Sequence, residues 1–277
     1  MKVLFNYAHN KFFQSQKLNT KTGYEVGGFD KVFEFGYNDM DSEYRTQNKY
    51  ILDKPKGAGY WMWKYYFAKK LLNDNDIPDG SYIFYADSGC YFTDNIDHLI
   101  NVMERDNISI MTFRQNHQAF ALTKRDAFIL TDTDEPKYTH TAMRCGGWFL
   151  LRKNDESRMF INDCYDYSLD YRIITDDGNE MGFENYKGFR FHRHDESIIT
   201  IVSKKWELYP YRNPSQDGYD YDVTYTDNIY GEEGTKRMFE NEFNNIFFGD
   251  SLKQYPEIYL DDKSTFPTII KLHRNSN

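Results

Sequence analysis

Short apolar runs alternate with longer amphipathic segments along most of this chain. The short runs predict strands at residues 2–8, 31–35, 82–86, 108–113, 147–152 and 206–209, with a last strand-like run at 268–272. The longer segments predict helices at 41–50, 60–72, 95–105, 124–130, 156–170, 195–203 and 237–248. Alternating strands and helices are typical of a mostly parallel sheet covered on both faces. We therefore expect an α/β fold in which helices flank a mixed, mostly parallel sheet.

Two stretches lack this periodicity. Residues 9–28 are polar and contain glycine, which predicts a loop that could include a short helix. Residues 213–230 are rich in Tyr, Asp and Gly, which predicts a long loop or lid within a loop-rich region at 210–235. No second domain is indicated there, so we expect one domain over residues 1–277.

Composition narrows the classes of partner. The net charge of −9 argues against non-specific nucleic-acid binding, which needs a basic surface. The chain has no apolar run of about 18 residues, and its first residues lack the layout of a secretory signal, so we expect no membrane span. The three cysteines (Cys90, Cys145 and Cys164) have no metal-ligand spacing, which favours free thiols in a reducing, cytoplasmic setting.

A candidate site begins where the apolar run 82–86 ends in Asp87, followed by Ser88 and Gly89. Ligands of open α/β sheets bind just beyond the carboxyl ends of the strands. An acid held there can bind a divalent cation, and the cation can hold a diphosphate. An equally good interpretation of this segment alone is that Asp87 only caps the turn.

Residues 56–64 form a second candidate site, which contains Gly57, Gly59, Tyr60, Trp61, Trp63 and Lys64. Glycine lets the backbone approach a ligand closely, and the start of a helix attracts an anion. Lys64, about one turn into the predicted helix, could reach a phosphate, and the tryptophans offer flat surfaces to a base or a sugar. The alternative is an aromatic helix face packed on the sheet, with Lys64 in solvent.

Gly146 and Gly147 precede a predicted strand that begins with Trp148. The glycines could open space beside a ligand, and Trp148 could stack on a sugar. A bulge leading into a core strand is an equally good interpretation.

The last motif lies at residues 192–197. Asp195 or Glu196 could act as a general base or stabilise an oxocarbenium-like centre, with His192 and His194 tuning the carboxylate or binding an acceptor. Alternatively, Asp195 and Ser197 cap the helix that follows.

Together and in this order, the four motifs resemble a family of glycosyltransferases with the GT-A fold, found in bacterial surface-polysaccharide gene sets and in large DNA viruses. The motifs are Gly-Ala-Gly-Tyr-Trp-x-Trp-Lys, Tyr-x-Asp-x-Gly-Cys, Gly-Gly-Trp-Phe-Leu-Leu-Arg and His-Arg-His-Asp-x-Ser-Ile, and the resemblance covers roughly residues 2–203. It implies that residues 1–115 bind a nucleoside diphosphate sugar as donor, and a UDP-sugar is the expected one. A glycan acceptor would then bind to residues 116–277. For a viral member, the expected location is the host cytoplasm.

The resemblance also implies roles for single residues. Asp87 is similar to an acid of the Asp-x-Asp motif that holds manganese or magnesium, and His273 resembles a histidine near the C-terminus that completes the metal site. From its position alone, His273 reads more readily as part of a loose tail. The sequence departs from the family pattern in two places: Gly89 replaces the second acid, and Glu196 stands where relatives more often carry glutamine.

We therefore expect an enzyme that transfers a hexose-type unit to a glycan. Loss of the second acid at Gly89 favours one alternative, a catalytically inactive sugar-binding protein on the same fold. A glycoside hydrolase that pairs Asp195 or Glu196 with another carboxylate is a further alternative, although it would not need the Gly/Lys segment suited to phosphate.

Overall fold

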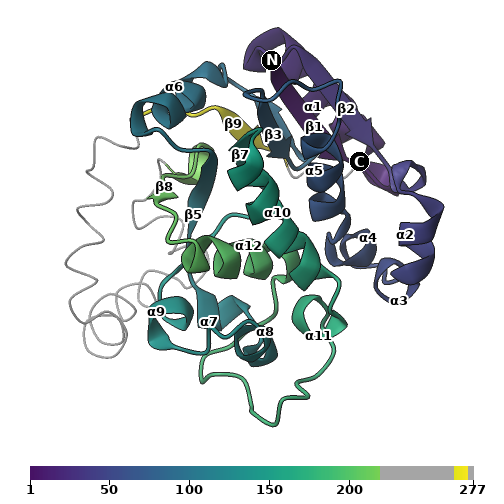
Figure 1. The fold of residues 1–277 in the computed structure, drawn as a ribbon, viewed down its shortest axis with the longest axis vertical. Coiled ribbons are helices and arrows are strands. Elements are labelled where there is room, and N and C mark those ends of the chain that lie inside the picture. Colours follow the sequence, from purple (N-terminus) through teal and green to yellow (C-terminus); the bar gives the residue numbers. More distant parts are fainter. Residues whose placement is uncertain (219–264, 274–277) are drawn as a thin grey trace.

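The computed structural model describes residues 1–218 and 265–273, which form an α/β fold around a seven-stranded sheet (Figure 1). The strand order is β2-β1-β3-β7-β5-β6, with β8 paired to β5. These strands are β1 (Lys2–Tyr7), β2 (Lys31–Phe35), β3 (Tyr82–Ala86), β5 (Ile110–Gln118), β6 (Ala142–Arg144), β7 (Trp148–Arg152) and β8 (Pro210–Tyr211). The pairings make β6 and β7 run opposite to the other strands, which confirms the predicted mixed, mostly parallel sheet.

Alternate side chains of the central strands enter two separate cores. In β1, Val3 and Phe5 join one core, whereas Leu4 joins the other. The first core includes α5 (Trp63–Leu72), α10 (Asp155–Ser168) and α12 (His194–Lys205), and α10 contacts both other helices (Figure 1). The second core includes α6 (Asp97–Asp106) and a small sheet of β4 (Cys90–Phe92) and β9 (Ile270–Leu272). Because both faces are covered, the strands are apolar on both sides.

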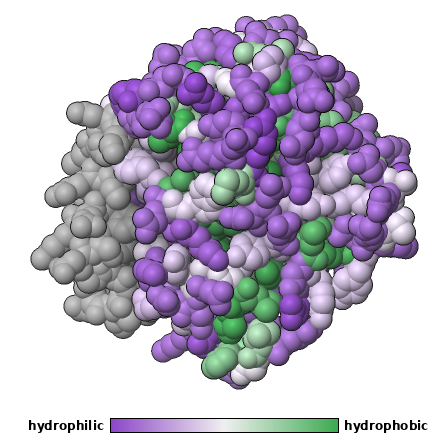
Figure 2. All heavy atoms as spheres, viewed as in Figure 1, coloured by the Kyte–Doolittle hydropathy of each residue, from purple (hydrophilic) through white to green (hydrophobic). Residues whose placement is uncertain are grey.

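The other helices are short and surround these layers. They are α1 (Phe13–Thr22), α2 (Ser42–Gln47), α3 (Lys49–Leu52), α4 (Gly57–Tyr60), α7 (Ala119–Leu122), α8 (Arg125–Leu130), α9 (Pro136–Thr139) and α11 (Tyr171–Ile174). Within the described ranges, none of the helices has the length and apolar character needed to cross a membrane. Figure 2 shows a mostly hydrophilic face with apolar residues in small, separate groups.

Residues 9–28, predicted as a loop possibly with a short helix, contain the ten-residue helix α1, and the turns at 10–12 and 23–27 leave less loop than expected. The helix buries polar side chains: Asn6 Nδ2 donates a hydrogen bond to Asn19 Oδ1 at 2.7 Å, and Gln16 Nε2 donates to Asn6 Oδ1 at 3.0 Å. Asn19 Nδ2 also donates to the carbonyl of Cys90 at 3.0 Å. A helix anchored by amides has no hydrophobic period, so the usual sequence signal is missing.

The predicted strand at 206–209 is wrong. Helix α12 continues to Lys205, the amide of Trp206 still donates to the carbonyl of Val202 at 3.0 Å, and the strand begins only at Pro210. The predicted helix at 237–248, and the predicted lid and loop-rich region beyond residue 218, lie outside the described residues.

Removing the buried amide of α1 should destabilise the fold. We expect Asn19→Ala to lower the free energy of unfolding by about 2 kcal/mol, because it leaves Asn6 Nδ2 and the Cys90 carbonyl without this partner. Urea denaturation measures the loss. The control is Gln14→Ala on the exposed face of the same helix, which should change stability by less than about 0.5 kcal/mol. Equal effects at both positions would contradict this account of α1.

Candidate functional site

The site lies where β3 ends and the antiparallel β7 begins. Ala86, the last residue of β3, pairs with Trp148, the first residue of β7. Asp87 and Gly147 therefore adjoin, and the Asp87 amide donates to the Gly147 carbonyl at 2.8 Å. This edge carries the carboxyl ends of β1 and β3, where ligands of α/β sheets bind.

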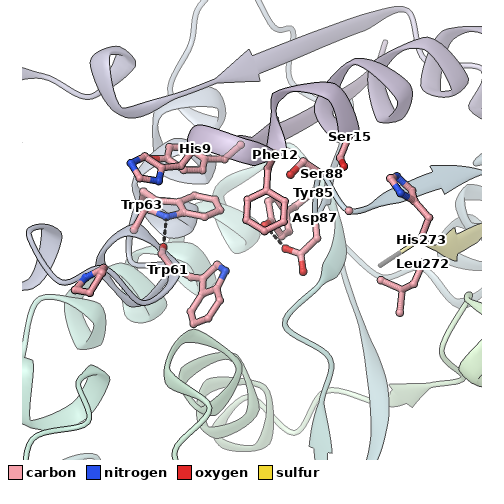
Figure 3. A pocket seen from close by; sticks show the side chains of 15 residues that line it. His9, Phe12, Ser15, Trp61, Trp63, Tyr85, Asp87, Ser88, Leu272 and His273 are labelled. Carbon is pink, nitrogen blue, oxygen red and sulfur yellow. Dashed lines mark hydrogen bonds between the residues drawn. The ribbon is translucent and has the colours of Figure 1, made fainter. Parts of the chain in front are cut away.

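Cavity A, of about 560 Å³, opens at this edge (Figure 3). Aromatic rings dominate its wall, and Asp87 lies between the two tryptophans and His273 in this view. The lining residues are Tyr7, His9, Phe12, Ser15, Pro55, Gly57, Ala58, Trp61, Trp63, Tyr85, Asp87, Ser88, Gly89, Leu272 and His273. The volume lies within the range of small-molecule sites, and the aromatic wall suits a flat ring.

Cavity B, of about 350 Å³, adjoins cavity A at Trp61 and Asp87, which line both. Its wall is more strongly charged. The lining residues are Lys56, Trp61, Lys64, Asp87, Gly146, Gly147, Phe191, His192, Arg193, His194, Asp195 and Glu196. A ligand reaching from A to B would pass Asp87 and Trp61.

A left-handed turn brings Trp61 to this junction. The φ angles of residues 57–61 are 59°, 51°, 94°, 54° and 60°, and the right-handed helix α5 starts only at Trp63. The predicted helix start at Tyr60 is therefore wrong. A left-handed conformation costs an L-residue other than glycine about 1–2 kcal/mol, and such strain concentrates at functional sites.

The turn requires glycine at positions 57 and 59, because side chains there would clash with their neighbours. A Cβ on Gly57 would lie 2.4 Å from the Trp61 ring, and one on Gly59 would lie 2.7 Å from Leu52 Cα. Gly59 and Tyr60 line neither cavity, so neither cavity supports their predicted contact with a ligand. Tyr60 is buried and its ring packs 4.6 Å from that of His194.

The Lys64 ammonium is buried beneath cavity B. Only 2% of the Lys64 side chain is exposed, and Nζ donates hydrogen bonds to Asp195 Oδ2 and to the Gly146 carbonyl. Asp87 Oδ1 lies 4.0 Å from the same Nζ. The alternative of a solvated Lys64 is therefore wrong, whereas its predicted contact with a phosphate stays a prediction.

Two tyrosines complete this charged cluster. Tyr85 Oη donates to Asp87 Oδ1, and Tyr65 Oη donates to the Asp195 carbonyl at 2.6 Å. Burial raises the pKa of Asp195 to about 7, because the nearby Lys64 offsets only part of the desolvation and Asp87 and Glu196 add repulsion. Burial disfavours charge on Lys64, but Asp195 and Asp87 outweigh that effect and raise the Lys64 pKa. A buried carboxyl that titrates near neutrality is typical of a functional site.

Glu196 adds a second carboxylate to cavity B. It lies 3.2 Å from an Arg193 guanidinium nitrogen, and burial raises its pKa despite that cation. Glu196 packs closely against Gly146, which has no side chain: a Cβ on Gly146 would lie 2.8 Å from Glu196 Cβ. The capping alternative for this motif is wrong, because Arg193 occupies the N-cap position of α12 and no side chain caps the helix.

The two histidines of the motif differ. His192 Nε2 donates to the Ile173 carbonyl at 2.7 Å, and Nδ1 accepts from the Lys124 amide at 3.2 Å. Burial lowers the His192 pKa well below its usual value, so the ring is neutral and both of its nitrogens are used within the fold. His192 lines cavity B, and its contact with an acceptor stays a prediction. His194 Nδ1 donates to the Ile174 carbonyl at 2.8 Å, while Nε2 has no hydrogen-bond partner among the described residues. Burial lowers the His194 pKa to about 4, so the ring is neutral, and its Nε2 lies 3.6 Å from Asp176 Oδ1.

The prediction that Trp148 stacks on a sugar is wrong. Its side chain is 2% exposed, belongs to the second core and lines neither cavity. The alternative of a core strand is correct for this residue. Gly146 and Gly147 line cavity B, and their contact with a substrate stays a prediction.

His273 is anchored, contrary to the loose-tail interpretation. It directly follows β9, and its amide donates to the Gly89 carbonyl at 3.0 Å. Its Nε2 is buried without a hydrogen-bond partner among the described residues, and His273 lines cavity A together with Asp87 and Ser88. No group of three or more His, Cys, Asp or Glu that could hold a metal occurs within residues 1–218 and 265–273.

Sequence reasoning missed several lining residues, among them Tyr7, Phe12, Tyr85 and Arg193. Tyr7 and Tyr85 are near the ends of β1 and β3, which pair as parallel neighbours. The position of both residues at the ends of predicted strands could have indicated that they line the site. Phe12 precedes α1, which the sequence pattern did not reveal.

No protein-family model and no curated protein matches the sequence. Among solved structures, the chain is similar to mouse xyloside xylosyltransferase 1 in its apo form, with 12% identity, 99% of this chain and 97% of that chain covered, and a TM-score of 0.47. It is also similar to the galactosyltransferase LgtC in complex with donor and acceptor sugar analogs, with 10% identity, 99% and 87% coverage, and a TM-score of 0.47.

Removing the buried cation should leave two carboxylates without their counter-charge. We expect Lys64→Met to lower the free energy of unfolding by about 3–5 kcal/mol at pH 7.5, measured by urea denaturation. The same substitution at the exposed Lys70 of α5 is the control and should cost less than about 1 kcal/mol. A loss at Lys64 no larger than that at Lys70 would refute the role of the cation.

The raised pKa of Asp195 predicts a pH dependence of stability. Between about pH 4 and pH 7 the folded protein holds a proton on Asp195 that the unfolded chain has released, so this residue makes stability fall as pH rises. The free energy of unfolding of Asp195→Asn, relative to wild type, should therefore increase from pH 5 to pH 7.5 by up to about 1.4 kcal/mol per unit. Parallel pH profiles of the two proteins would show that the Asp195 pKa is not raised.

Proposed function

We propose that this chain is a glycosyltransferase that moves a hexose-type sugar from a nucleoside diphosphate sugar to a glycan acceptor. One observation carries the proposal: an aromatic cavity and a carboxylate-lined cavity meet at Asp87 and Trp61. Transfer needs two adjoining sites, because a new bond must form between the bound donor sugar and the bound acceptor. The motif resemblance to GT-A glycosyltransferases supports the same assignment.

Cavity A is the proposed donor site, and a UDP-sugar is the proposed donor. Aromatic faces such as Trp61 and Phe12 suit a nucleobase or ribose, and Ser88 lies beside Asp87 to meet the diphosphate. Most of the lining comes from residues 1–115, our proposed donor half, with β9 and His273 added from the C-terminal part. Residues 116–277 form the proposed acceptor half of a single domain.

The residues at cavity A fit a divalent cation bound together with the diphosphate. Asp87 offers a carboxylate whose side chain is 39% exposed, and His273 offers a buried Nε2 that lacks a hydrogen-bond partner among the described residues. Magnesium is commonly held by one or two carboxylates plus substrate phosphates, so two protein ligands suffice. Manganese or magnesium here would neutralise charge on the leaving diphosphate.

Cavity B is the proposed acceptor site. The acceptor oxygen would form a bond to the anomeric carbon while the bond from that carbon to the diphosphate breaks, and the hydroxyl proton would pass to Asp195 or Glu196. A carboxyl with a pKa of about 7 suits this work, because it is partly ionised at neutral pH and still basic. Lys64 holds the Asp195 carboxylate in place and supplies positive charge near Asp87.

An inactive sugar-binding protein is the second candidate, and Gly89 in place of a second acid favours it. It would bind sugar and nucleotide without turnover. A glycoside hydrolase remains distinguishable from both, because it acts without any nucleotide. The free buried thiols of Cys90, Cys145 and Cys164 support a reducing, cytoplasmic setting.

A thermal-shift screen of nucleoside diphosphates and their sugars tests the donor site. A ligand at about 100 times its Kd adds about 2.7 kcal/mol of stability, which for a chain of this size raises the melting temperature by about 5–10 °C. We expect UDP and UDP-sugars to give this shift, and manganese or magnesium to enlarge it. The Asp87→Ala variant should fold and lose the metal-dependent part.

Trp61→Ala should abolish the nucleotide shift, because Trp61 forms the wall between the cavities. Trp206→Ala is the matched control, since Trp206 follows α12, lines neither cavity and bonds Asp163 instead. The donor assignment fails if no nucleotide shifts the wild type, or if the two tryptophan variants behave alike.

A further inference from the structure

The cleft continues beyond cavity B into a third cavity. Cavity C, of about 160 Å³, shares Phe191 and His192 with cavity B. Its wall comes largely from the segment between α11 and α12, together with Lys124. Nothing in the proposed transfer step uses this space.

The wall of cavity C combines apolar rings with oxygen-rich polar groups. Phe191 is 48% exposed, and Phe189 lies in the same wall. Asp176, Asp177 and Asn185 provide carboxylate or amide oxygens. An aromatic face beside hydrogen-bonding oxygens suits a sugar ring, which has apolar C–H faces and hydroxyls at its edge.

Cavity C also holds a buried polar atom without a hydrogen-bond partner among the described residues, Asn179 Oδ1. The Asn179 amide nitrogen is already used, since it donates to the Phe183 carbonyl at 3.1 Å and to Asn185 Oδ1 at 3.0 Å. An unpaired buried acceptor costs about 1–3 kcal/mol, which a ligand hydroxyl would recover by donating to it.

Contacts with the rest of the fold hold this segment in place. Lys56 pairs with Asp176 at 2.9 Å, and Tyr50 Oη donates to Asp177 Oδ2 at 3.0 Å. Lys124 Nζ donates to the Asp177 carbonyl at 3.1 Å. A wall fixed from three sides is preorganised, so a ligand loses little free energy in ordering it.

We propose that cavity C is a second acceptor subsite, which binds the sugar next to the one that reacts. The acceptor is then an oligosaccharide of at least two sugars rather than a free monosaccharide. The unpaired amide oxygen favours a sugar that donates to it through a hydroxyl. This inference rests on the proposed function, because that function places the reacting sugar in cavity B.

Saturation-transfer NMR on the full chain tests the subsite without any nucleotide. The probes are methyl glycosides of common neutral hexoses and disaccharides built from the same hexoses. We expect at least one disaccharide to bind about tenfold more tightly than its methyl monosaccharide, with saturation reaching both rings. Phe191→Ala should remove this gain and the saturation of the second ring.

Phe183→Ala is the matched control. Phe183 is an equally exposed phenylalanine of the same segment, at 53%, but it lines neither cavity B nor cavity C, so the gain should persist. The subsite is refuted if no probe binds, if no disaccharide gains over its monosaccharide, or if Phe191→Ala keeps the gain. The nucleotide thermal shift tests the proposed function separately. If nucleotides raise the melting temperature but no disaccharide binds more tightly than its monosaccharide, only the subsite is refuted.

Discussion

The buried ammonium of Lys64 is the contact on which the site depends. It joins α5 to the Gly146 carbonyl before β7 and to Asp195 in the first turn of α12, and it lies 4.0 Å from Asp87 at the end of β3. Four elements far apart in the sequence thus share one cation. A buried charge is stable only when it is paired and hydrogen-bonded, so these elements must meet as they do.

The same cluster links the fold to the chemistry. Desolvation raises the Asp195 pKa to about 7, and Lys64 prevents a larger rise, so the carboxyl exchanges its proton near neutral pH. Gly146 and Gly147 have no side chains to block this approach, and the left-handed turn at 57–61 sets Trp61 over the junction of the two cavities. Strain in the turn and burial of charge are both costs that a merely structural edge of a sheet would avoid.

The sequence revealed features that follow from local patterns. The apolar strand before Asp87 and the acids in the first turn of α12 were visible, because strand ends and helix starts carry residue signals. Other features depend on tertiary contacts. The amide-anchored α1 has no hydrophobic period, the burial of Trp148 follows from its place in the second core, and the anchoring of His273 needs the pairing of β9 with β4. The environment of Lys64 was hidden for the same reason.

The most direct test of the central claim is mass spectrometry of a glycan incubated with the protein and a UDP-sugar. The account predicts a glycan heavier by one sugar unit and an equal amount of released UDP, with both lost in Asp195→Asn. Cleavage of the glycan in the absence of nucleotide would point to a hydrolase. An unchanged glycan, together with undiminished UDP-sugar, across donors that raise the melting temperature would contradict transfer and leave a protein that only binds.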